Sequence, residues 1–90
     1  MTTIWDLKIG ELLGCVSHGH ANIGDRVSVH HSWTTDGHHD EYVAAALGTR
    51  VGNSYNVCRS NVGAGVVVKS RGGRRGGRLT VKLDELASHR

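Results

Sequence analysis

Several residue types are missing or scarce in this chain of 90 residues. It has no proline and no phenylalanine, and only two tryptophans and two tyrosines supply large aromatic rings. No stretch approaches the roughly 18–20 apolar residues of a membrane-spanning helix, which excludes such a helix. Two cysteines, Cys15 and Cys58, are too few for a disulfide framework. Together with an N-terminus unlike a signal peptide, this predicts a cytoplasmic protein, nucleoid-associated if its host is a cell.

Aliphatic residues supply the material for a core. The chain has 11 valines, 7 leucines and 3 isoleucines, and they recur from Ile4 to Leu86. This distribution excludes a disordered chain and fits one small domain over residues 1–90. A domain of this size buries only roughly 60–65% of the surface of its unfolded chain, so we expect marginal stability.

Charge is divided unevenly along the chain. Residues 1–48 contain two basic and six acidic residues, a net charge of −4. Residues 49–90 contain nine basic and two acidic residues, a net charge of +7. This asymmetry predicts that the second half faces a polyanion, and an ordinary soluble surface with uneven charge is the alternative.

Local patterns predict three helices and a short strand. Apolar side chains repeat at helical spacing in residues 4–17, 37–47 and 51–62. Cys58 lies on the apolar stripe of the third segment and is interpreted as a small buried hydrophobe. Residues 26–33 alternate with period two, which predicts a strand with one buried face.

A basic hairpin is predicted near the C-terminus. Residues 66–71 and 78–83 flank a segment of four glycines and two arginines. If Val68 pairs with Val81, the residue numbers of every opposed pair sum to 149. This register separates an apolar face from a mostly basic one. Such a hairpin packs on a core with one side only.

The order of these elements resembles the winged helix-turn-helix family of DNA-binding domains. The resemblance is carried by residues 42–49, YVAAALGT, and residues 63–67, GAGVV, which flank the third predicted helix and lead into the basic hairpin. It implies an α+β fold, a single small winged helix-turn-helix domain with three helices, a short strand and a two-stranded C-terminal wing. It also implies non-enzymatic binding of duplex DNA, as a transcriptional regulator or a recombination accessory factor.

In this family, helix 51–62 would enter the major groove, and the wing would lie along the backbone or in the minor groove. The resemblance therefore implies a DNA-binding set made of Thr49, Arg50, Asn53, Asn56, Arg59, Ser60, Lys69, Arg71, Arg74, Arg75 and Arg78. Alternatively, the polar face of the helix is an ordinary solvated surface and the arginines form a solubilising loop. A homodimer is also expected, because palindromic sites use two-fold proteins, and Trp5 marks its candidate surface.

Other functions stay open on the sequence alone. The segments Arg71-Gly72-Gly73 and Arg75-Gly76-Gly77 resemble RGG elements that bind RNA. A protein-binding inhibitor or adaptor is the third possibility. No cofactor is expected: Cys15, His18 and His20 have a ligand-like spacing, but paired Cys-x-x-Cys knuckles are missing. No nucleophile paired with a base and no phosphate loop indicates an enzyme.

Overall fold

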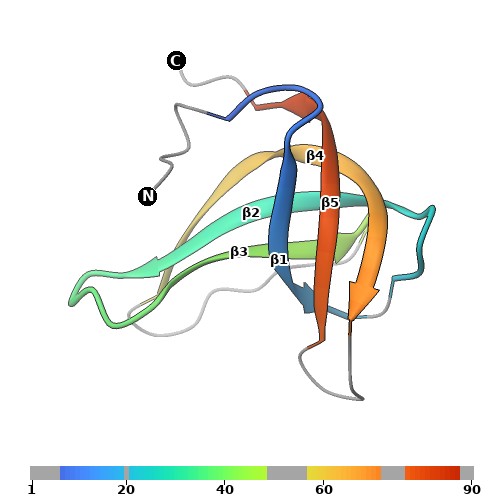
Figure 1. Cartoon of the computed structure of the whole chain (residues 1–90). Helices are drawn as coiled ribbons and strands as arrows, with labels where there is room; N and C mark the ends of the chain where they lie inside the picture. The colour runs from blue at the N-terminus through green and yellow to red at the C-terminus, as the bar shows by residue number, and fades with distance from the viewer. Residues whose placement is uncertain (1–6, 20, 49–56, 72–76, 88–90) are drawn as a thin grey trace.

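The described part of the protein is all-β, and its five strands close into a barrel (Figure 1). The computed structural model describes residues 7–19, 21–48, 57–71 and 77–87. Around the barrel the strands follow the order β1-β3-β2-β4-β5, and β5 pairs with β1 to close it. The strands are β1 (Leu12–His18), β2 (Arg26–Thr34), β3 (Asp40–Ala46), β4 (Val57–Arg71) and β5 (Arg78–Leu86). The described part of the chain contains no helix that could cross a membrane.

The predicted α+β class and the winged helix-turn-helix resemblance are therefore wrong. Strand β1 includes residues 12–17 of the first predicted helix, β3 includes residues 40–46 of the second, and β4 begins with residues 57–62 of the third. Residues 7–11, 37–39 and 47 of these predictions form turns and irregular segments, and residues 4–6 and 51–56 lie outside the described residues. A winged helix-turn-helix needs helices, and the described segments contain only strands and turns.

In β1, burial follows the period of a strand and not the helical spacing that the sequence suggested. Leu13 and Cys15 are buried while Leu12 and Gly14 are exposed, which is the period of a strand with one face in the core. Strand β3 differs, because Val43, Ala44 and Ala45 are all buried. Its run of small residues reads as a helix by propensity, but this stretch is a strand buried on both faces.

The predicted strand and the predicted hairpin are confirmed. Residues 26–33 lie in β2, and the two arms of the hairpin lie in β4 and β5. The expected register holds next to the turn, where Lys69 pairs with Thr80 and Arg71 with Arg78. A β-bulge between Val67 and Lys69 then shifts it by one residue. Val67 therefore enters the core and Val68 points outward, the reverse of the predicted faces.

Strand β4 is long and curved, and it connects the two sides of the barrel. It pairs with β2 along its first part and with β5 along its second, and Figure 1 shows it arching over the other strands. Gly63 and Gly65 lie where the backbone of β5 comes closest. A Cβ atom on Gly65 would overlap the carbonyl oxygen of Lys82 and lie 2.7 Å from a methyl carbon of Val81. Only glycine fits this approach.

The interior is filled by aliphatic side chains from all five strands. Burial raises the pKa of the Cys15 thiol to about 12, so this group stays protonated at neutral pH and acts as a small apolar residue. The central members of the core are Leu7, Leu13, Cys15, Val27, Val29, Ala44, Val62, Val67, Leu79, Val81 and Leu83.

Strands β2 and β3 continue past the closed part of the barrel as an arm. Strand β1 pairs with β3 only from Val43 to Ala45, whereas β2 and β3 stay paired out to Trp33 and Asp40. The turn at the tip is held by a hydrogen bond from the Thr34 amide to the His39 carbonyl, 2.9 Å long. We use "the arm" for residues 30–42, which extend to one side in Figure 1.

Candidate nucleic-acid interface

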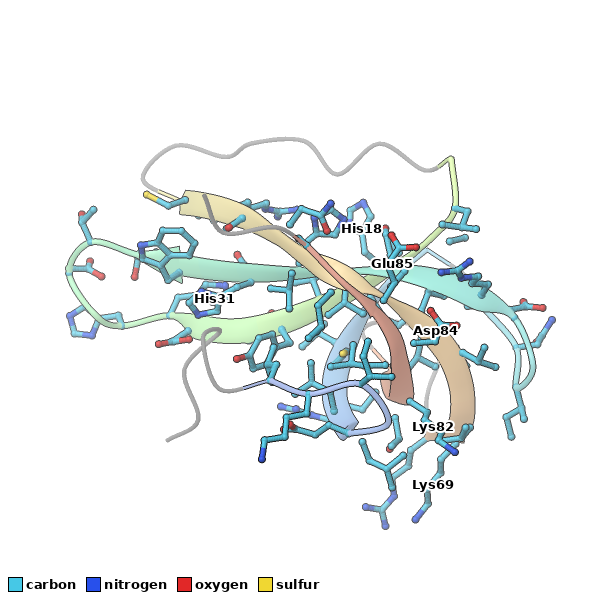
Figure 2. The ribbon with its side chains drawn as sticks, turned by 90° about the horizontal axis from the view of Figure 1, so that it is seen from above. His18, His31, Lys69, Lys82, Asp84 and Glu85 are labelled. Atoms are coloured by element: carbon cyan, nitrogen blue, oxygen red, sulfur yellow. The ribbon has the colours of Figure 1, made fainter. Side chains whose placement is uncertain are left out.

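Four cationic side chains gather on the outer face of β5 and the second part of β4. On β5, Arg78 and Lys82 alternate with the buried residues Leu79 and Val81, so they point away from the core. The β4–β5 register places Lys69 opposite Thr80, between them. We use "the basic face" for the exposed side chains of Lys69, Arg71, Arg78 and Lys82, two of which are labelled in Figure 2.

None of these four side chains forms an ion pair with an acidic residue of the described segments. Arg26 is a contrasting case, because it donates hydrogen bonds to Asp84 at 2.9 Å and to Glu85 at 3.3 Å. Both acidic residues of the C-terminal half are therefore paired with a cation that is not part of the basic face. Four like charges without a partner repel one another, and an anion that binds among them relieves this repulsion.

A shallow hollow of about 180 Å³ opens in the basic face. Gly14 of β1 lines the hollow without a side chain, and a Cβ atom placed on it would meet nothing within 4 Å. Strand β1 thus leaves room where β5 carries Thr80, whose hydroxyl group can donate a hydrogen bond. The lining residues are Gly14, Lys69, Arg71, Arg78, Leu79 and Thr80. Cationic side chains around exposed backbone suit a phosphate group.

Comparisons with known protein families, curated proteins and solved structures find no match for this chain.

The structure brings together three of the residues assigned to DNA binding. Lys69, Arg71 and Arg78 lie on the basic face. Lys82 was absent from the assigned set, although the predicted hairpin already placed it on the same face as Arg78. The residues outside the described part of the chain are Thr49, Arg50, Asn53, Asn56, Arg74 and Arg75.

Arg59 and Ser60 do not form part of a recognition helix, because both lie in the first part of β4. They pair with Ser32 and His31 in the arm, near the opposite end of β4 from the basic face. The Nε and Nη1 atoms of Arg59 are buried and have no hydrogen-bond partner among the described residues. The helical interpretation implied that Arg59 contacts DNA. In the structure, these two guanidinium nitrogen atoms are buried and are not presented to a phosphate group.

The histidines and Cys15 do not assemble into a metal site within the described residues. No group of three or more His, Cys, Asp or Glu side chains converges there. Cys15 is fully buried in the core, while His18 lies on the surface, because residues three positions apart on a strand point to opposite sides. His20 lies outside the described residues.

One hydroxyl–imidazole–carboxylate chain lies in the arm. The Oγ atom of Ser32 is 3.2 Å from Nε2 of His39, and Nδ1 of His39 is 3.7 Å from Oε1 of Glu41. These groups have the order of a nucleophile, a base and an orienting acid. Ser32 is only 1% exposed, so a substrate has no access to its hydroxyl group. We therefore interpret the Ser32–His39–Glu41 contacts as structural.

The acid side of the stability profile should depend on His30. Burial lowers its pKa from 6.5, and the charges of Arg59 and His18 lower it further. Between the lowered pKa and 6.5 the folded protein binds fewer protons than the unfolded chain, so stability falls as the pH falls through this interval. When the pH is lowered from about 7.5 to about 5, we expect the melting temperature of His30→Gln to decrease by less than that of the parent. Equal losses in thermal melts would contradict this assignment.

Proposed function

We propose that this protein binds nucleic acid through the phosphate backbone, without a catalytic step, using the basic face. The observation that carries the proposal is the group of four cations, unpaired with any described acid, three of which line the hollow beside Gly14. Phosphate contacts supply most of the non-specific affinity for nucleic acid. The two paired arginines Arg71 and Arg78 also flank, in the sequence, the segment that contains Arg74 and Arg75.

The mode of binding differs from the one that the winged-helix resemblance implied. The basic face lies on the curved pair of strands β4 and β5, and no aromatic side chain of the described residues lines its hollow. Its exposed apolar neighbours are the aliphatic residues Leu12 and Val68. Contacts to phosphate position a protein but carry no sequence information directly. We therefore expect little preference among sequences at this face. A cytoplasmic location, where nucleic acid is at hand, fits this proposal.

A salt titration tests the proposal directly. Fluorescence anisotropy would follow the binding of a labelled 20-base-pair duplex, and of either of its single strands, between about 50 and 200 mM salt. With four phosphate contacts, the slope of log affinity against log salt should be about −3.6 for the duplex and about −2.8 for a single strand. No binding to either form at about 50 mM salt, or a slope near zero, would refute it.

A further inference from the structure

The arm carries a second surface that the basic face does not explain. The cross-strand register places Tyr42 beside His31, and Asp40 beside Trp33. These four side chains share one face of the arm, because residues two apart on a strand point the same way. It is the face that continues into the core at Val29 and Ala44. We use "the aromatic shelf" for His31, Trp33 and Tyr42.

The rings of the aromatic shelf are held in a defined arrangement. The imidazole of His31 stacks on the indole of Trp33, with ring centroids 4.8 Å apart and an interplanar angle of 19°. On its other side His31 meets the ring of Tyr42 at 5.4 Å and 43°. The Nε2 atom of His31 lies 2.6 Å from Oδ1 of Asp40, which fixes the plane of the imidazole. Trp33 stays partly exposed at the outer end of the row.

Charge separates the aromatic shelf from the basic face. In Figure 2, His31 lies in the arm on one side of the molecule, and Lys69 and Lys82 lie together on the other. The arm carries the acidic residues Asp36, Asp40 and Glu41 and no lysine or arginine. A phosphate group is disfavoured next to these carboxylates. Aromatic rings beside hydrogen-bond acceptors instead suit the flat faces and the amino groups of nucleobases.

We infer that the aromatic shelf stacks unpaired bases on Trp33, so that this protein favours single-stranded over duplex nucleic acid. This inference rests on the proposed function, because the basic face supplies the phosphate contacts of the same strand. The molecule measures 33 × 30 × 25 Å. Small barrels that bind single strands cover roughly 4–16 nucleotides, so one strand reaches both surfaces. The bases of a duplex are already stacked and paired, and they are not available to Trp33.

The test compares a single-stranded 12-mer with a duplex of the same length, binding to the parent and to Trp33→Leu. We expect Trp33→Leu to lower the affinity for the single strand roughly 5- to 100-fold and to leave the duplex affinity unchanged. Trp33→Tyr, which keeps a ring able to stack, should restore most of the loss. The Trp5→Phe variant leaves Trp33 as the one indole in the chain, and its fluorescence should be quenched by the single strand only.

The possible outcomes separate this inference from the proposed function. If the parent binds neither form, the proposed function fails and the inference fails with it. If the parent binds both forms and Trp33→Leu weakens both equally or neither, the inference fails while backbone binding stands. An unchanged duplex affinity in Trp33→Leu also shows that the variant is folded, so a selective loss on the single strand cannot come from unfolding.

Discussion

Gly65→Ala is expected to lower the free energy of unfolding by at least about 3 kcal/mol, as severe overpacking does. The added Cβ atom would overlap a backbone carbonyl oxygen, that of Lys82, and would press on the side chain of Val81. Backbone on both sides of the contact cannot move aside as a flexible side chain can, so β4 and β5 must separate. In a domain of this size each kcal/mol shifts the melting temperature by about 4–8 °C, which predicts a fall of more than about 10 °C.

Gly14→Ala is the matched control, since Gly14 is also a strand glycine. A Cβ atom there meets nothing within 4 Å, and the position is exposed. We expect its stability to stay within about 0.5 kcal/mol of the parent. Thermal melts of both variants by circular dichroism make the comparison. A Gly65→Ala protein that melts with the parent would show that β4 and β5 do not approach as closely as described.

Neutralising the basic face should remove most of the affinity for nucleic acid. Replacing Lys69, Arg71, Arg78 and Lys82 together by glutamine should weaken binding at least about 100-fold at low salt, because each charged hydrogen bond contributes about 1.5–3 kcal/mol. The slope of log affinity against log salt should flatten by about three units. All four side chains are exposed, so the fold should persist. Parent-like affinity with a parent-like slope would remove the basic face from the proposed function.

Two further variants separate charge number from position. Arg26→Gln also removes one positive charge, but that charge is already paired with Asp84 and Glu85. It should therefore weaken binding less than Arg78→Gln.

Gly14→Val fills the hollow without changing the charge, and valine is favourable in strands. It should lower affinity while leaving the salt slope nearly unchanged, as measured in the same anisotropy titrations.

The sequence predicted the basic hairpin because its information is local. Two alternating segments joined by glycines pair with each other, and the face that carries Lys69, Arg71 and Arg78 follows from the pattern alone. Lys82 could be found in the same way, by extending that face along β5. The hollow could not, because Gly14 lies near the other end of the sequence and reaches Thr80 only through the barrel closure.

The helices were predicted wrongly for two physical reasons. The register of β4 against β2 shifts at Val62, the last residue of the third predicted helix, and this shift interrupts the period-two signal at the end of that segment. The middle of β3, Val43 to Ala45, is buried on both faces and shows no alternation. The parallel pairing of β1 with β3 leaves no trace in either strand, since it depends on elements that lie between them in the chain.

The closure of the barrel also dictates when the protein can fold. Leu12 of β1 pairs with Lys82 of β5, near opposite ends of the chain. During synthesis β1 leaves the ribosome several seconds before β5, at roughly 5–20 residues per second. Until then one edge of β1 lacks its partner and its apolar face lacks a cover. Contacts between such distant segments make folding slow, on the order of milliseconds to seconds. The nascent chain is thus most exposed to aggregation just before β5 appears.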